Sequence, residues 1–99
     1  MQIVAKRRLR EFWLEHPRAQ APLAAWYRIV AHAKWAGTAD IKATFGTTVD
    51  FVGDHRVIFD IGGNKYRLII HVAYEFERVL IKFVGTHEAY DRIDPETVS

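Results

Sequence analysis

The chain has 99 residues, of which 49% are hydrophobic, and its 14 Lys and Arg against 12 Asp and Glu give a formal net charge of only +2. This length predicts one domain, residues 1–99, with enough apolar and aromatic side chains to bury a core. The absence of cysteine excludes disulfides and thiolate metal sites and suits a cytoplasmic protein. No apolar run reaches the ~20 residues of a membrane span, and the first basic residues are not followed by the apolar region of a secretory signal.

The N-terminal third predicts a short edge strand and two helices. Residues Met1–Val4 form β-prone sequence, and a helix is expected over Lys6–His16, where Pro17 ends it. A second helix has Pro22 in its first turn and runs to about Lys34. The apolar residues at helical spacing are Leu9, Phe12 and Trp13 in the first helix and Leu23, Trp26, Tyr27 and Val30 in the second. Two amphipathic helices in succession favour a helical hairpin packed on a sheet.

The middle of the chain predicts one turn of helix followed by strands. Residues 38–41 resemble a capped single turn, with Ile41 and Phe45 pointing inward. Phe51–Val52 is expected to be a strand that turns at Gly53–Asp54 into a strand over Arg56–Ile61.

A meander of antiparallel strands is expected to follow. Gly62–Asn64 is a tight-turn signal that predicts a hairpin with the next strand, and residues 75–78 connect that strand to the last one. Thr86 or Asp91 is positioned to cap a short C-terminal helix or turn, and residues 94–99 are expected to fray. The predicted fold is therefore α+β, with two N-terminal helices on one face of a small, mainly antiparallel sheet.

Alternation along the last two strands separates an apolar face from a charged one. Tyr66, Leu68, Ile70 and Val72 are predicted to share one face, and Lys65, Arg67, Ile69 and His71 the other. In the last strand Val79, Ile81 and Phe83 are predicted to face one way, and Leu80, Lys82 and Val84 the other. Pairing of these strands would place Arg67 and Lys82 on one face of the sheet.

Several kinds of chemistry have no support in the residues. The five His are scattered without a paired spacing, which argues against zinc, and no Gly-rich loop precedes a helix to bind a phosphate. The only serine is Ser99, which excludes a serine nucleophile. The remaining candidates are Arg56, Lys65, Arg67, Lys82, His87, Tyr90, Asp91 and Arg92. Cations on adjacent strands, with Tyr and His between them, suit RNA binding or cleavage. The pattern alone slightly favours the simpler interpretation that Arg67 and Lys82 solvate an open sheet face.

A second basic cluster lies in the first turn of the first helix. Its residues are Lys6, Arg7 and Arg8. Cations there oppose the helix macrodipole by about 0.3–1 kcal/mol each, which invites a role in binding RNA, a ribosome or a protein partner. A solvated helix face explains the cluster equally well.

Five short motifs resemble the HigB family of toxins, within the RelE-like superfamily. They are Ile-Val-Ala-Lys-Arg-x-Leu-Arg (3–10), Ala-Trp-Tyr (25–27), Asp-Ile-Lys-Ala-x-Phe-Gly (40–46), Gly-Asn-Lys-Tyr-Arg-Leu (63–68) and Phe-Val-Gly-Thr-His-x-x-Tyr-Asp-Arg-Ile-Asp (83–94). The resemblance covers nearly the whole chain. It implies a small ribonuclease that cleaves mRNA, commonly on the ribosome, and that a cognate antitoxin, often a helix-turn-helix protein, holds inactive.

The resemblance also implies roles for individual residues. Arg67 corresponds to the central-strand arginine directed at the scissile phosphate, and Lys82 to a second cation on the last strand. His87 and Tyr90 match a C-terminal His-x-x-Tyr motif, although Glu88 stands where the RelE-like pattern tends to have arginine. The implied mechanism needs neither metal nor cofactor: His87, or alternatively Asp91, takes the proton of an RNA 2′-hydroxyl that attacks the adjacent phosphate.

Two other classes of function remain open from the sequence. The same basic face would serve a non-catalytic module that binds RNA or the ribosome. It would also serve a protein-interaction domain with an acidic partner.

Overall fold

A computed structural model describes residues 1–53 and 55–99, and Asp54 of the expected Gly53–Asp54 turn lies outside the described residues. The strands are β1 (Gln2–Val4), β2 (Val49–Val52), β3 (Arg56–Ile61), β4 (Tyr66–Ala73) and β5 (Arg78–Thr86). The helices are α1 (Lys6–Glu15), α2 (Gln20–His32), α3 (Thr38–Phe45) and α4 (His87–Tyr90), with single 3₁₀ turns at Pro17–Ala19, Gly46–Thr48 and Tyr74–Phe76. The predicted α+β architecture is confirmed.

The five strands form one sheet in the order β1-β5-β4-β3-β2. β1 runs parallel to β5 at one edge, and the other three pairs are antiparallel. β3 and β4 form the predicted hairpin around Gly62–Asn64, in a register that pairs Ile61 with Tyr66. Gly62 and Gly63 have positive φ angles, which glycine adopts without the cost that a side chain would bring.

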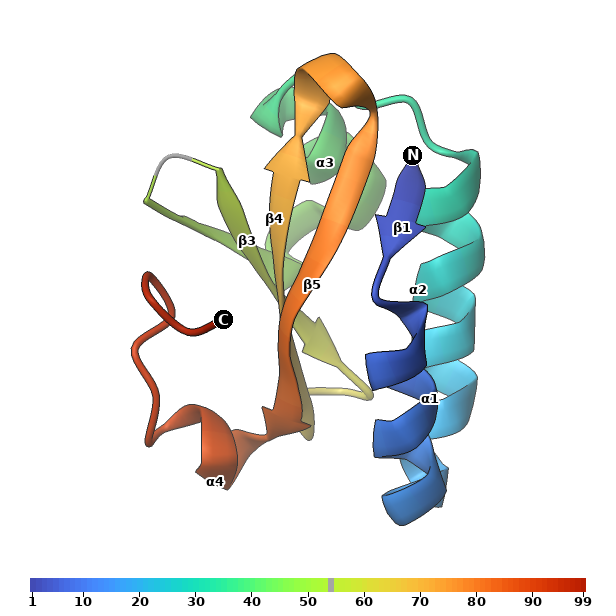
Figure 1. The fold of residues 1–99 in the computed structure, drawn as a ribbon, viewed down its shortest axis with the longest axis vertical. Helices are drawn as coiled ribbons and strands as arrows, with labels where there is room; N and C mark the ends of the chain where they lie inside the picture. The colour runs from blue at the N-terminus through green and yellow to red at the C-terminus, as the bar shows by residue number, and fades with distance from the viewer. Residues whose placement is uncertain (54) are drawn as a thin grey trace.

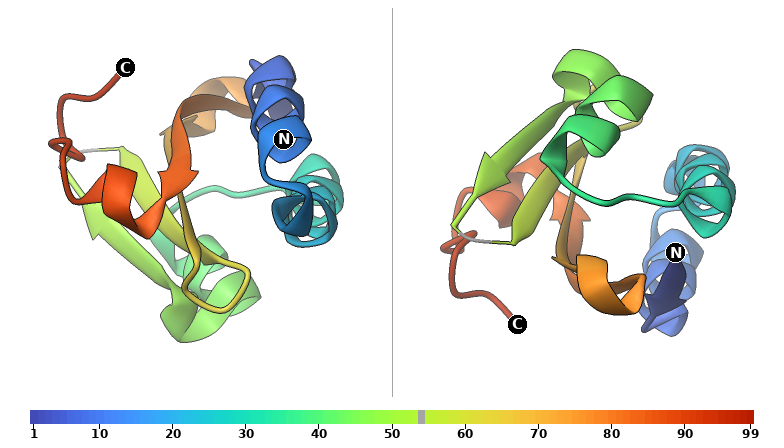
Figure 2. Two further views of the ribbon diagram at one scale, coloured as in Figure 1. Left: turned by 90° about the horizontal axis from the view of Figure 1, so that it is seen from below. Right: turned by 90° about the horizontal axis from the view of Figure 1, so that it is seen from above.

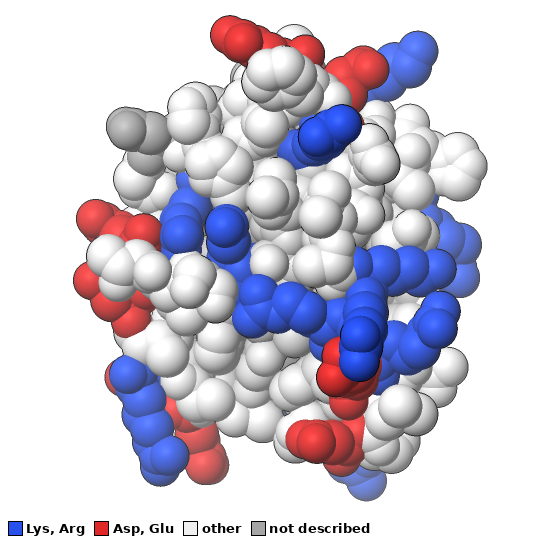
Figure 3. Space-filling view, in the orientation of Figure 1, with Lys and Arg blue, Asp and Glu red and all other residues white. Residues whose placement is uncertain are grey.

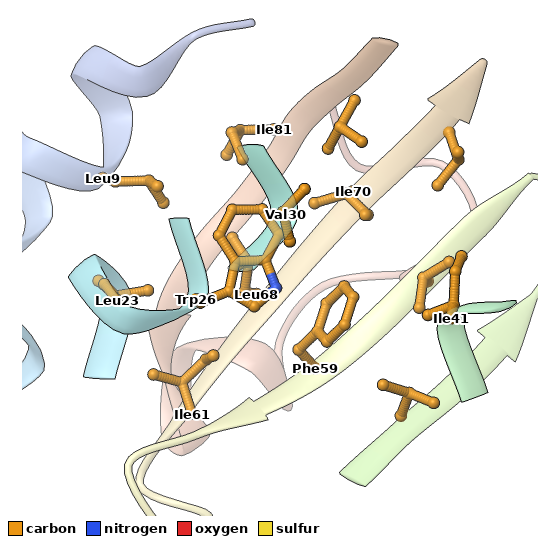
Figure 4. Close-up of a cluster of buried hydrophobic side chains, with 14 of the residues drawn as sticks. Leu9, Leu23, Trp26, Val30, Ile41, Phe59, Ile61, Leu68, Ile70 and Ile81 are labelled. Carbon is orange, nitrogen blue, oxygen red and sulfur yellow. The ribbon is translucent and has the colours of Figure 1, made fainter. Parts of the chain in front are cut away.

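The helices divide between the two faces of the sheet (Figures 1 and 2). α1 and α2 cover one face together with α3, while α4 and the C-terminal segment lie over the opposite face. Figure 4 shows Leu23, Trp26 and Val30 of α2 pointing at the strands, as their helical spacing predicts. They meet the core face of β3 and β4, where Phe59, Leu68 and Ile70 are each no more than 1% exposed. The candidates on the strands are therefore left on the face that α1 and α2 do not cover, whereas Lys6, Arg7 and Arg8 lie on α1 itself.

The structure corrects three expectations. α3 is a helix of eight residues rather than a single turn, because Ile41 and Phe45 both pack on the core and the Asp40 carboxylate accepts from the Ala36 N–H at its start. The C-terminal residues are not frayed: the Arg56 guanidinium donates to the carbonyls of Pro95 and Val98.

The third correction concerns the two faces of β5. Ile69 pairs with Phe83 whereas Ile70 pairs with Ile81, so Lys82 is an extra residue in a β-bulge. Beyond the bulge the alternation is reversed. Phe83 lies on the face of Ile69 and Arg67, and Val84 packs against the core, opposite to the prediction.

Candidate active site

Arg67 lies in β4 on the face turned away from α1 and α2, and four neighbours fix its position. Across the sheet it pairs with Asp60 on one side and Gly85 on the other. Its Nε lies 3.2 Å from the Asp60 carboxylate, and one Nη donates to the carbonyls of Asn64 and Tyr66, each at 3.4 Å. Only 12% of the arginine side chain is exposed. The guanidinium is thus held in one orientation, as transition-state stabilisation by a preorganised group requires.

Asp60 is a residue of this site that sequence reasoning missed. The signal was present, because a hairpin that turns at residues 62–65 and pairs Ile61 with Tyr66 must place Asp60 opposite Arg67. Asp60 is 37% exposed and carries one negative charge into a cationic region. It orients the guanidinium and leaves the opposite edge of that group for another partner.

α4 brings an imidazole and a carboxylate to the same end of β4. The Thr86 side chain caps this helix by accepting from the Ala89 N–H at 3.1 Å, as one of the two predicted caps. The backbone N–H of His87 donates to the Lys65 carbonyl at 3.2 Å, which ties the start of α4 to the residues before β4. His87 Nδ1 lies 3.3 Å from the Asp91 carboxylate.

The Asp91 carboxylate beside Nδ1 favours one tautomer of the His87 ring. With Nδ1–H directed at Asp91, the other ring nitrogen, Nε2, carries a lone pair, and it makes no hydrogen bond within residues 1–53 and 55–99. The two side chains are 47% and 62% exposed, so a substrate can reach them. This arrangement can accept a proton from a bound hydroxyl group.

Tyr90 links α4 to Arg67. The Arg67 Cζ lies 5.5 Å from the centre of the Tyr90 ring, within the range of a cation–π contact. The Tyr90 ring in turn lies 6.4 Å from that of Phe83, which the bulge has brought to this face. Tyr90 therefore joins Arg67 to the short segment that bears the His87–Asp91 pair, and Phe83 packs there unexpectedly.

The other predicted cations differ in where they lie and in whether their side chains are free to bind RNA. Arg56 pairs with His71 across β3 and β4, and Lys82 lies in the bulge two positions beyond Leu80, the residue of β5 that pairs with His71. Lys65, whose carbonyl accepts from the backbone N–H at the start of α4, and Arg92, which follows α4, are both exposed. The Arg56 guanidinium is engaged with the C-terminal segment, so it is less available to RNA than was predicted.

The N-terminal cluster lies on α1, in the other layer of the molecule, and its side chains have partners there. Lys6 Nζ lies 4.5 Å from the centre of the Tyr27 ring, and Arg7 pairs with Glu11 at 3.1 Å on the exposed helix face. Arg8 donates to the Ile81 carbonyl at 2.9 Å, beside the bulge in β5. Figure 3 shows Lys and Arg side chains in a band across the middle of the molecule, between the side of the C-terminal segment and the side of α1.

Two further findings bear on the chemistry of the site. Among the described residues, no three His, Asp or Glu side chains come together as a set that would hold a metal ion. No helix in the described part of the chain is long and apolar enough to cross a membrane.

Fold and site together define a small α+β protein with three helices on one sheet face and, on the other, an arginine packed against the tyrosine of a short helix that also carries a histidine. The profile of the HigB_toxin family, described as the RelE-like toxic component of a toxin-antitoxin system, matches residues 19–93. Because this match spans most of the chain, the protein belongs to the HigB toxin family.

Individual relatives carry a functional name. The mRNA interferase toxin HigB of Escherichia coli (strain K12) is 26% identical over 92 residues, which covers 92% of this chain and 88% of that protein. The mRNA interferase HigB of Shigella flexneri has the same identity and coverage. The mRNA interferase HigB of Escherichia coli O6:H1 is 22% identical over 94 residues, covering 94% of this chain and 91% of the relative.

Proposed function

We propose that this protein is an mRNA interferase: an endoribonuclease toxin that cleaves mRNA in the cytoplasm and is neutralised by a cognate antitoxin. Membership of the HigB family and the printed names of its relatives support this function. The observation that carries it is the fixed Arg67 guanidinium, packed against Tyr90 on the short helix that also bears the His87–Asp91 pair.

The proposed reaction uses the RNA 2′-hydroxyl as the nucleophile. His87 Nε2 takes the hydroxyl proton while Asp91 holds Nδ1–H, and the 2′-oxygen attacks the adjacent phosphorus. The bond from phosphorus to the 5′-oxygen breaks, and Tyr90 or a protonated group supplies a proton to that oxygen. The products are a 2′,3′-cyclic phosphate and a 5′-hydroxyl. Asp91 remains the alternative base.

Charge stabilisation falls to the cations of the same face. Arg67 is proposed to donate charge-assisted hydrogen bonds to the phosphate oxygens as negative charge develops on them. Lys82 and Lys65 add positive charge near the RNA strand, and Arg92 extends the same surface beyond α4. An arginine that is only 12% exposed and already oriented by Asp60 suits this role, because little reorganisation is needed when the charge appears.

The partners follow from the family and the charge distribution. We propose that cleavage takes place on the ribosome, where the basic band of Figure 3 faces RNA. The antitoxin is proposed to be a helix-turn-helix protein. Exposed cations such as Lys6 and Arg7 on α1 are available to ribosomal RNA or to the antitoxin.

The test is to express the wild type beside Arg67→Ala and His87→Ala and to map mRNA 5′-ends. Loss of a charge-stabilising donor costs about 10²–10³ in rate and loss of a general base about 10²–10⁴, so both variants should stop inhibiting growth and stop cutting mRNA. His32→Ala, which changes an exposed histidine on α2, serves as the matched control and should cut normally.

Two outcomes would contradict the proposal. If folded Arg67→Ala and His87→Ala remain fully toxic, the site is assigned to the wrong residues. If the wild type binds ribosomes and inhibits growth without creating new 5′-ends, the protein is a binding module rather than a nuclease.

A further inference from the structure

A pocket of about 460 Å³ lies at the end of β4 distant from α4, and the mechanism makes no use of it. Its walls come from the end of β4, the following 3₁₀ turn, the residue before β3 and the residues before α3. The lining residues are Ala36, His55, His71, Val72, Ala73, Tyr74, Glu75 and Phe76.

Half of the lining residues carry aromatic rings. The His55 ring lies 5.6 Å from the His71 ring and 6.2 Å from the Tyr74 ring, in both cases steeply inclined. Phe76 also lines the pocket and is 71% exposed, so its ring is open to a ligand. Single-stranded RNA is bound by rings of this kind, because unstacked bases lie on Phe, Tyr and His side chains.

Polar groups at the pocket suit the edge of a nucleobase. The pKa of His71 is lowered, first by burial and then by the charges of His55, Lys82 and Arg56, so its imidazole is mainly neutral near pH 7 and can both donate and accept. Burial and the charge of Asp40 raise the pKa of the Tyr74 hydroxyl, which keeps its proton as a donor. The Glu75 carboxylate can accept from an exocyclic amino group.

The pocket also lies on the path of an RNA strand that passes Arg67. His71 follows Arg67 by four residues in β4 and faces the same way, which separates the two side chains by about 13 Å along the strand. Lys82 lies in the bulge between them, and its charge acts on His71. An RNA strand with one phosphate at Arg67 would therefore pass the cationic side chain of Lys82 before it reaches the pocket. This favours RNA, with its evenly spaced phosphates, over an acidic peptide as the occupant.

We propose that the pocket lined by His55, His71, Tyr74 and Phe76 receives one unstacked base of the RNA whose scissile phosphate lies at Arg67. This proposal rests on the proposed function, and it makes the pocket the part of the molecule that selects where the strand is cut. The bound base belongs to a nucleotide at a fixed distance from the cut, and not to either of the two nucleotides joined by the scissile bond at Arg67.

The first measurement is binding of uncleavable RNA. Short 2′-O-methyl oligoribonucleotides of A, C, G or U alone are titrated into the wild type and into Phe76→Ala and His71→Ala, with fluorescence anisotropy as the readout. The wild type should prefer one base, and each variant should lose that preference and bind it at least about fivefold more weakly, since a stacked base contributes this much or more. Leu14→Ala, which removes an apolar side chain of similar exposure (73%) from α1, should bind as the wild type does.

The second measurement is the cut-site sequence in mapped mRNA 5′-ends. In Phe76→Ala and His71→Ala, cuts should still depend on Arg67, while the base preference at one position relative to the cut disappears. If both variants keep the wild-type base preference in binding and in cutting, the pocket does not hold a base, although the nuclease function stands. If they lose only neutralisation by the antitoxin, the pocket belongs to that protein and the proposal is overturned. A wild type that never cleaves would end the proposed function, and the oligonucleotide titration would still decide the pocket.

Discussion

His71 lies on the open face of the sheet, where its surroundings lower the pKa of its imidazole. It is half-buried, and it lies beside His55, Lys82 and Arg56, which repel a proton on its ring. Burial is the largest of these causes, and all of them lower the pKa of the imidazole below its usual 6.5. The folded protein therefore disfavours the charged form of a residue that becomes charged readily when the chain unfolds.

This shift predicts a pH dependence of stability that belongs to one residue. Below about pH 6.5 the unfolded chain binds a proton at His71, whereas the folded chain binds it only at a lower pH, because its pKa is lowered. The free energy of unfolding therefore falls as the pH falls from about 6.5 towards the pKa of the folded state. His71→Gln removes this contribution. The drop in melting temperature between about pH 7.5 and about pH 5.5 should therefore be smaller in His71→Gln than in the wild type.

A matched control uses another histidine. His32→Gln, at an exposed position on α2, should reproduce the wild-type drop in thermal melts at the same two pH values. Equal drops in His71→Gln and the wild type would mean that the ring is charged as easily in the folded protein as in the unfolded chain.

At the residue scale, motif and alternation together predicted where the candidate side chains lie, while their roles stay predictions. Arg67, His87 and Tyr90 lie at one end of β4 as expected, because two strands and a capped helix place them there. Asp60 and His71 were not predicted as functional residues, because what gives each of them its surroundings is a partner on a neighbouring strand and not a pattern in its own strand. His71 was placed on the correct face, but its neighbour His55 precedes β3 and is far from it in sequence.

At the scale of elements, most strands and helices follow from local patterns, whereas the β5 bulge does not. The sequence of β5 is apolar on both sides of Lys82 and carries no mark of the bulge, so only the pairing with β4 shows that one residue is inserted there. The docking of the C-terminal segment has the same origin, since it depends on Arg56 in β3 reaching carbonyls some forty residues away. Long-range pairing of this kind leaves no periodic signal.

The bulge predicts a coupling between Gly85 and Phe83. Gly85 pairs with Arg67, and a Cβ at this glycine would lie only 2.5 Å from the tip of the Phe83 ring. Gly85→Ala should therefore push the ring away from Tyr90 and lower the free energy of unfolding by about 1–3 kcal/mol, the usual cost of overpacking. Cleavage of mRNA should fall as well, because Tyr90 packs on Arg67.

A double-mutant cycle checks the cause. In a Phe83→Ala background the obstacle is gone, so Gly85→Ala should cost distinctly less in urea unfolding than it does in the wild type. Equal costs in both backgrounds would show that the glycine is needed for its backbone and not for the space that it leaves to Phe83.

At the scale of the whole molecule, the distribution of charge matters more than its sum. A net charge of +2 is small for a protein that binds RNA, yet the Lys and Arg side chains gather in a band across one face while acidic groups lie mainly around its margins (Figure 3). The fold creates this separation by giving one sheet face to α1, α2 and α3 and leaving Lys82 and Arg67 on the other.

This separation predicts which cations determine the salt dependence of RNA binding. Each phosphate contact on a single strand adds about −0.7 to the slope of the logarithm of the binding constant against the logarithm of the salt concentration. Lys82→Ala should therefore flatten the slope measured with uncleavable RNA by about 0.7. Lys42→Ala removes the same charge from the exposed side of α3, in the layer behind the sheet, and should leave the slope unchanged. If Lys42→Ala flattens the slope as much as Lys82→Ala does, RNA responds to the net charge of the protein, and the strand does not follow the band past the bulge of β5.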